Sequence, residues 1–108
     1  MPRETLGEFE KLVMLAVLRL RGDAYGAEIL RELEERAGRV ASAGAAYVAL
    51  RRLERKDMVA SALGESTPGR GGRPKRYYTV RPEGVEALRE ARSQWDALSE
   101  GLDDVLGT

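Results

Sequence analysis

The sequence predicts a mainly α-helical protein with one small β-hairpin and a long helix near its C-terminal end. Three observations carry this fold class. Three successive segments have apolar residues at helical spacing, two strand-like segments flank a glycine-rich stretch, and an amphipathic segment follows a proline. The 108 residues fit one domain. Three helices followed by a hairpin is the element order of a winged helix-turn-helix.

The first two helices are predicted at Gly7–Leu20 and Tyr25–Ala37, where apolar residues recur every three or four positions. Thr5 and Glu8 have the spacing of a capping box, so we expect both side chains to accept hydrogen bonds from free backbone amides of the first helix. Gly38 is a natural C-terminal stop for the second helix.

The third helix is predicted to begin near Ser42, a favourable N-cap residue, and to end near Lys56. One side of this helix has small and aliphatic residues and is expected to be buried. That side consists of Ala46, Ala49, Leu50 and Leu53. A different side carries residues spaced four apart, namely Ala43, Tyr47, Arg51 and Arg55. This second side is expected to face outward.

The hairpin is predicted from two strands and the segment between them. Val59–Leu63 alternates in the manner of a strand, and Arg76–Val80 is aromatic and β-branched. Residues 64–75 contain four glycines, two prolines and three basic residues, which predicts a loop. Together these segments form a hairpin with a long basic tip.

The last helix is predicted to start at Pro82, which suits a first helical turn, and to continue past Leu102. Its apolar residues from Trp95 to Val105 follow the 3-4-3 spacing of a coiled-coil seam. A seam without a partner in its own small domain favours a second copy of the chain, so we expect a homodimer. The expected interface residues are Leu88, Trp95, Leu98, Leu102 and Val105.

Composition argues against several classes of function. The chain has no cysteine and no histidine, so disulfides, thiolate metal sites and histidine catalysis are excluded. No nucleophile–base pair or metal cluster is visible, and Gly69–Arg73 lacks the Lys-Ser/Thr ending of a phosphate-binding loop. We therefore expect no enzyme, cofactor or metal. No apolar run of ~20 residues and no signal region is present, so a cytoplasmic location without membrane contact is expected.

The net charge is zero, but the charges are unevenly distributed. Residues 39–81 hold ten Lys or Arg against three Asp or Glu, whereas residues 82–108 hold two against seven. A basic centre between acidic ends concentrates positive potential on one part of the molecule. A nucleic-acid-binding protein needs such a local field, whatever its total charge.

The third helix and the hairpin are the predicted DNA-binding elements. The major groove of B-DNA is ~12 Å wide and admits one α-helix, in which Tyr47 and Arg51 can reach base edges. Arg52, Arg55 and Lys56 are expected at the sugar-phosphate backbone, and the basic hairpin along a backbone or in a minor groove. The predicted DNA-binding residues are Ser42, Ala43, Gly44, Tyr47, Arg51, Arg52, Arg55, Lys56, Arg70, Arg73, Lys75 and Arg76.

Several motifs, taken in order, resemble the PadR family of transcriptional regulators. They are Leu6–Glu10 with Leu15–Leu20, Tyr25-Gly26, Gly44–Leu50 with Arg52–Glu54, Gly72–Tyr78, and Pro82–Gly84. The family usually has glycine where this chain has Asp57. The resemblance implies a winged-helix dimer that represses promoters, and it favours the short subfamily with a single C-terminal helix. It divides the chain into a DNA-binding domain, 1–81, and a dimerisation helix, 82–108.

The sequence leaves two alternatives open, one for the role of Trp95 and one for the function of the fold. Trp95 fits an interface core, but in some short PadR-like regulators aromatic residues on this helix line a pore and stack on flat ligands, so a small hydrophobic effector is a second interpretation. The family resemblance implies that the last helix packs on the first and last helices of the other subunit, which favours a pseudo-palindromic operator. A winged helix that binds another protein is the alternative function.

Overall fold

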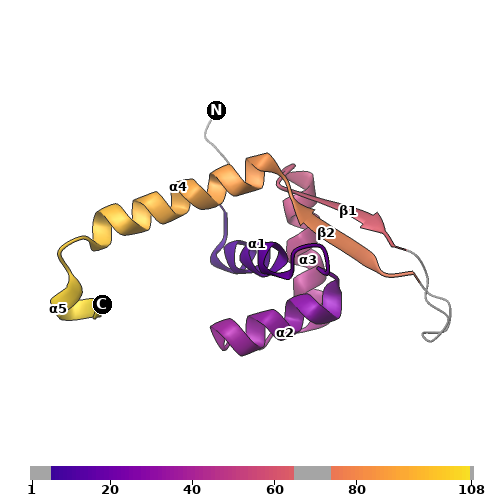
Figure 1. The fold of residues 1–108 in the computed structure, drawn as a ribbon, viewed down its shortest axis with the longest axis horizontal. Helices are drawn as coiled ribbons and strands as arrows, with labels where there is room; N and C mark the ends of the chain where they lie inside the picture. The colour runs from indigo at the N-terminus through magenta and orange to yellow at the C-terminus, as the bar shows by residue number, and fades with distance from the viewer. Residues whose placement is uncertain (1–5, 65–73, 108) are drawn as a thin grey trace.

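A computed structural model describes residues 6–64 and 74–107, and it has the predicted fold: a mainly α-helical chain with one antiparallel hairpin (Figure 1). In chain order the elements are α1 (Glu8–Leu20), α2 (Gly26–Ala37), α3 (Ala43–Arg55), β1 (Val59–Leu63), β2 (Arg76–Val80), α4 (Pro82–Ser99) and α5 (Asp103–Leu106). The limits of the two strands match the sequence prediction, and those of α2 and α3 agree with it within about one residue.

The core forms where α1 packs between α2, α3 and the hairpin. Val13 and Met14 of α1, Ile29 of α2 and Leu53 of α3 are fully enclosed. All four residues predicted for the buried side of α3 are indeed buried: Ala46, Ala49, Leu50 and Leu53. This packing fixes the rotation of α3 about its own axis, so its other side faces away from the core.

The start of α1 differs from the predicted capping box. Gly7 is the N-cap residue, and the Glu10 carboxylate accepts a hydrogen bond of 2.9 Å from the Gly7 amide. Glu8 is the first residue of the helix, so it cannot be the third residue that a capping box requires. The predicted partner Thr5 lies outside the described residues. The prediction was wrong because Glu10 also binds Lys56, the residue directly after α3, in a tertiary contact that local spacing does not reveal.

The hairpin is attached to the junction between α1 and α2. Its register pairs Val59 with Val80 and Leu63 with Arg76. The Tyr78 amide donates to the Ala24 carbonyl at 2.8 Å, and the rings of Tyr25 and Tyr77 meet edge to face with centroids 5.6 Å apart. These contacts hold the hairpin in a set orientation beside α3.

The turn between α3 and β1 explains a departure from the family pattern. Asp57 has a left-handed backbone, with φ of 59°. Glycine adopts this conformation without steric cost, whereas aspartate is one of the few other residues that tolerate it. Asp57 can therefore occupy the left-handed position at which the sequence resemblance expects glycine.

The C-terminal helix is shorter than predicted. α4 ends at Ser99, and Gly101 has a positive φ of 82°, after which α5 forms a single short turn. The prediction that the helix continues past Leu102 was therefore wrong. Gly101 is the physical reason, because glycine is the weakest helix former after proline and readily adopts a positive φ.

α4 projects away from the three-helix body and carries α5 at its far end (Figure 1). The radius of gyration is 15.8 Å, above the ~13 Å expected for a compact chain of this length. The extents of 54 × 35 × 22 Å reflect the same projection. Much of α4 therefore lacks the covering that a compact fold gives its helices.

Candidate nucleic-acid interface

The predicted outward side of α3 is exposed. Tyr47 is 52% exposed, and Arg51 one turn later donates a hydrogen bond of 3.1 Å from Nη1 to the Tyr47 hydroxyl. Ser42 caps the helix by accepting from the Ala45 amide at 3.0 Å. Ala43 and Gly44 follow as small, exposed residues in the first turn. The start of α3 can therefore approach another surface closely, and the two larger side chains stand beside it.

The arginines of α3 spread over two sides of the helix, and Arg55 lies between those sides. At about 100° per residue, Arg51 and Arg55 lie within about 80° of Tyr47 around the helix, whereas Arg52 lies about 140° away. Arg52 and Arg55 border a surface hollow of about 430 Å³ together with Glu10 and Lys56. The helix thus has cations on the Tyr47 side and on the side nearer α1.

Lys56 occupies a different setting from the other predicted DNA contacts. Its Nζ lies 3.0 Å from Oε2 of Glu10, and the two side chains are only 17% and 10% exposed. The carboxylate neutralises the ammonium and fixes its position. This pair joins the C-terminal end of α3 to the first turns of α1, so Lys56 has a structural role that the sequence did not predict.

The described part of the hairpin places Arg76 beside α3. Arg76 is exposed, and it borders a shallow hollow of about 410 Å³ that Tyr47 and Tyr78 also line. The Lys75 ammonium lies 3.8 Å from the centre of the Tyr25 ring, a cation–π contact that anchors the hairpin to the start of α2. The predicted DNA contacts Arg70 and Arg73 fall outside the described residues.

Two ionisable groups near this surface have shifted pKa values. Burial raises the pKa of the Tyr78 phenol, and the nearby Glu54 carboxylate adds to that rise. Tyr78 is therefore neutral at physiological pH. On the exposed surface of α2, the hydrogen bond from Arg31 lowers the pKa of the Glu28 carboxyl. Neither group has the pKa near neutrality that a general acid or base would need.

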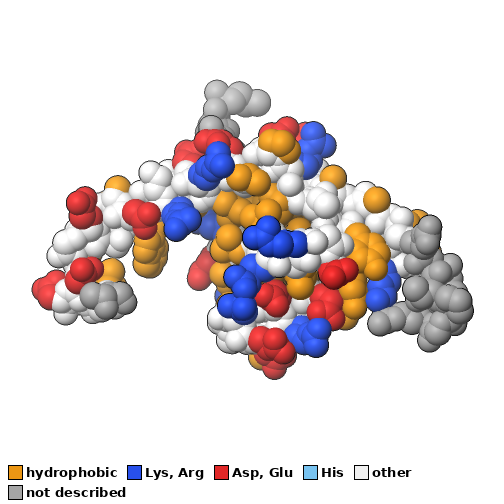
Figure 2. Space-filling view, viewed as in Figure 1, with side chains coloured by type: hydrophobic (Ala, Val, Ile, Leu, Met, Phe, Trp, Pro, Cys, Tyr) orange, Lys and Arg blue, Asp and Glu red, His pale blue; other side chains and the backbone are white. Residues whose placement is uncertain are grey.

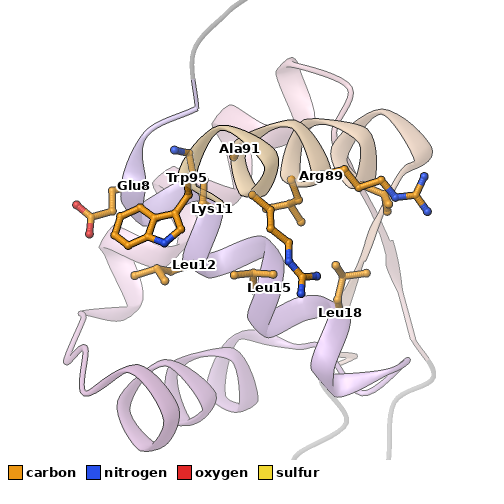
Figure 3. A pocket seen from close by; sticks show the side chains of 11 residues that line it. Glu8, Lys11, Leu12, Leu15, Leu18, Arg89, Ala91 and Trp95 are labelled. Carbon is orange, nitrogen blue, oxygen red and sulfur yellow. The ribbon is translucent and has the colours of Figure 1, made fainter. Parts of the chain in front are cut away.

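A second surface lies between α1 and α4. Here a groove of about 970 Å³ is lined mainly by apolar side chains, which Figure 2 shows gathered where the two helices meet. Figure 3 shows Trp95 of α4 lying close to Leu12 of α1, with Leu15 and Leu18 further along the same wall. Trp95 is 69% exposed, so a large aromatic surface faces the groove without cover.

The predicted interface residues have different environments. Leu88 is partly buried against the core, whereas Leu98 is 82% exposed and Val105 is 75% exposed. Leu102 follows the end of α4 and is half-exposed. The apolar face therefore runs from the groove to the chain end, but it bends at Gly101 and is no straight coiled-coil seam.

Within residues 6–64 and 74–107, no three His, Cys, Asp or Glu side chains gather in a way that could hold a metal ion. None of the helices in that part of the chain has the length and apolar character needed to cross a bilayer.

Two residues beside the interface were missed by sequence reasoning. Glu54 of α3 and Ser61 of β1 form a hydrogen bond to each other at 3.0 Å, and Arg76 bonds to the same serine. The alternation of β1 places Ser61 on the same face as Val59. The sequence does not reveal the strand register and the position of α3 that bring the three side chains together.

The fold and this surface define a class of protein. A three-helix unit whose third helix faces outward beside a β-hairpin is a winged helix-turn-helix, the architecture of many transcriptional regulators. A model of the family described as "Transcriptional regulator PadR-like family" matches residues 14–90. The chain belongs to this family, whose members are transcriptional regulators and not enzymes.

Solved structures agree with this assignment. A PadR family regulator from Eggerthella lenta is 34% identical, with a TM-score of 0.69 and coverage of 94% of this chain and 88% of that one. A PadR-like transcription factor from Bacteroides fragilis is 28% identical, with a TM-score of 0.70 and coverage of 90% and 88%. A PadR family regulator from Clostridium difficile is 25% identical, with a TM-score of 0.70 and coverage of 92% and 99%. No curated protein matches the chain.

Proposed function

We propose that this regulator is a repressor that binds a pseudo-palindromic DNA operator as a homodimer. The observation that carries the proposal is the exposed pair of Tyr47 and Arg51 on α3, on the same side as Arg76 of the hairpin. A helix that presents a tyrosine and an arginine one turn apart can enter a major groove and reach base edges there.

The proposed contacts follow from the geometry of α3. Its capped N-terminus carries small residues, so its amides can approach a phosphate. Arg51 is the candidate for two hydrogen bonds to guanine O6 and N7, and Arg52 and Arg55 lie where they can reach the flanking backbone. Lys56, which pairs with Glu10, remains a predicted contact of the same flank. Arg70 and Arg73 remain predicted contacts of the hairpin tip.

The homodimer is proposed from the uncovered apolar face of α4. Residues 1–81 would form the DNA-binding unit and residues 82–108 the dimerisation segment. A second copy covering the groove would bury Trp95 and Leu98, and apolar burial contributes ~25 cal/mol per Å². Two-fold symmetry would then set two copies of α3 about one DNA turn, ~34 Å, apart.

A small hydrophobic effector is a second role for the same groove. Its volume of about 970 Å³ lies within the range of ~300–1,000 Å³ typical of ligand pockets. A flat ligand stacked on Trp95 would relieve repression by favouring a dimer whose recognition helices are wrongly spaced. Because Trp95 is the only tryptophan, quenching of its fluorescence by planar hydrophobic compounds tests this role, and unchanged emission would reject it.

The proposed DNA binding is tested first by selecting bound fragments from random double-stranded DNA. A repressor of this kind enriches a two-fold-related sequence and loses affinity steeply as salt rises. Recovery of no enriched sequence would contradict the proposal. It would favour the alternative that the same fold binds a protein partner.

Replacing Arg51 with Ala should weaken binding to the selected operator by about 1–3 kcal/mol and relax the sequence preference at the bases it reads. The matched control is Arg36→Ala on α2, which removes the same charge from an exposed residue outside the predicted DNA contacts. Fluorescence anisotropy on the operator and on scrambled DNA gives both affinities. An equal loss on the two DNAs would show that Arg51 contacts phosphate only.

Replacing Leu98 with Glu should dissociate the proposed dimer. Two-fold symmetry would bury two new carboxylates in an apolar face, and each uncompensated polar group costs about 1–3 kcal/mol. Analytical ultracentrifugation measures the change, and we expect a dimer dissociation constant raised at least ~10-fold. Leu63→Glu, at a 61% exposed leucine of the hairpin, is the control. If the Leu98→Glu protein dimerises like the wild type, Leu98 of α4 does not lie in the dimer interface.

A further inference from the structure

Two hydrogen bonds in series connect α3 to both strands of the hairpin. The Ser61 hydroxyl on β1 donates to Glu54 Oε2 on α3 at 3.0 Å. Arg76 on β2 donates from Nη1 to the same Ser61 oxygen, also at 3.0 Å. The serine hydroxyl therefore donates once and accepts once, and each of the three side chains comes from a different element.

The strand register explains why these groups meet. Ser61 pairs with Tyr78, which lies two residues after Arg76 on β2. Residues two apart on a strand share a face, so Arg76 is the diagonal neighbour of Ser61 on that face. Glu54, in the last two turns of α3, is partly buried against this face. The chain of bonds thus spans the seam between α3 and the hairpin.

We propose that Ser61 and Glu54 are positioning residues that hold Arg76 ready for DNA beside the outward side of α3. The proposal rests on the proposed function, because it assigns the source of affinity at that same surface. Arginine has a long side chain that loses rotamer freedom when a ligand immobilises it. A side chain already fixed by Ser61 loses less of that freedom on binding, which strengthens the complex without adding any contact.

The charge of Glu54 supports this assignment. A carboxylate at the edge of a DNA-binding surface repels phosphates, which lowers affinity unless the charge has another role. Here the carboxylate accepts a hydrogen bond from the Ser61 hydroxyl, which leaves the serine oxygen free to accept one from Arg76. Glu54 thereby orders a cation that lies closer to the exposed surface than the carboxylate itself, since Arg76 is exposed and Glu54 is partly buried.

The test compares Ser61→Ala with the wild type on the selected operator. We expect a 3- to 10-fold loss of affinity and a shallower dependence of affinity on salt, because one ordered phosphate contact is lost. The midpoint of thermal unfolding should change little, since both bonds lie at a partly exposed edge. Ser61→Thr keeps a hydroxyl on a β-branched residue and should restore the affinity. Thr79→Ala is the control, because Thr79 is an exposed residue of β2 that takes no part in the two hydrogen bonds.

A double-mutant cycle identifies the residue through which Ser61 acts. In an Arg76→Ala background, Ser61→Ala should cause no further loss of affinity. Wild-type affinity in Ser61→Ala, or an equal loss in the presence and absence of Arg76, would overturn the proposal. The proposal would also be overturned if Ser61→Ala lost affinity together with a lower midpoint of thermal unfolding, while the salt dependence of its affinity stayed unchanged. Failure of the proposed function is distinct, because the wild type itself would then select no DNA sequence.

Discussion

Replacing Lys56 with Met is expected to lower the free energy of unfolding by about 2–4 kcal/mol. The substitution keeps most of the side-chain volume but leaves the Glu10 carboxylate enclosed without its cation. Breaking a buried ion pair by removing one partner typically costs ~3–5 kcal/mol, because an uncompensated charge remains. We expect somewhat less here, since the Gly7 amide still donates to Glu10 and both side chains retain some exposure to water.

The control and the reverse test use pairs of variants. Arg36→Met removes an exposed cation from its ion pair with Glu32, which keeps Arg19 as a second partner, and should cost under ~1 kcal/mol. Adding Glu10→Leu to Lys56→Met should recover part of the loss, because an apolar pair of similar volume leaves no buried charge. Urea denaturation measures all four proteins. A Lys56→Met protein as stable as the Arg36→Met protein would show that the Lys56–Glu10 pair adds little.

The Lys56–Glu10 pair also bears on how the proposed activities could be linked. α1 carries Glu10 toward the C-terminal end of α3, while Leu12 and Leu15 of the same helix line the groove beside α4. One helix therefore contacts both the helix proposed to read DNA and the proposed dimer or ligand surface.

Replacing Gly84 with Ala is expected to destabilise the protein by about 1–3 kcal/mol, the usual cost of overpacking. A Cβ at this position would lie 2.5 Å from the Met58 carbonyl oxygen and 2.7 Å from Cγ1 of Val80. The carbonyl is backbone that starts the hairpin, so it cannot rotate away as a flexible side chain would. The first turn of α4 would have to move outward.

Gly26→Ala is the matched control for that substitution. Gly26 is also in the first turn of a helix, but no atom outside its own helix lies within 4 Å of a Cβ built there. The Gly26→Ala substitution should leave the stability of the protein unchanged or raise it slightly, since alanine is the better helix former. Thermal unfolding compares the two variants. Equal midpoints for Gly84→Ala and Gly26→Ala would mean that α4 shifts without cost, and the close approach would then have no structural role.

Much of the fold follows from local patterns in the sequence. The apolar positions of α3 identify its buried side, which leaves Tyr47 and Arg51 outside. The alternation of Val59–Leu63 predicts β1, and the aromatic and β-branched residues of Arg76–Val80 predict β2. Apolar periodicity and strand alternation are properties of neighbouring residues, so they can be recognised without a partner segment.

The predictions that failed or fell short depended on contacts between distant segments or on a local break. The sequence predicts Lys56 as a basic residue after Arg52 and Arg55, but it does not reveal the pairing with Glu10, 46 positions earlier in the chain. The capping residue of α1 was misplaced for a related reason, since Glu10 serves both the Gly7 amide and that lysine. The end of α4 differs from the prediction because Gly101 breaks the helix although the apolar spacing continues beyond it.

From the sequence alone came the order of the helices and strands, the outward side of the third helix and the basic centre of the chain, because each depends on residues close to one another. Tertiary structure alone decided which cations are available at the surface. Lys56 forms an ion pair with Glu10, Lys75 lies over the Tyr25 ring, and Arg76 donates a hydrogen bond to Ser61. The physical reason is that a charge acts through its partners, and those partners are brought close only when the chain folds.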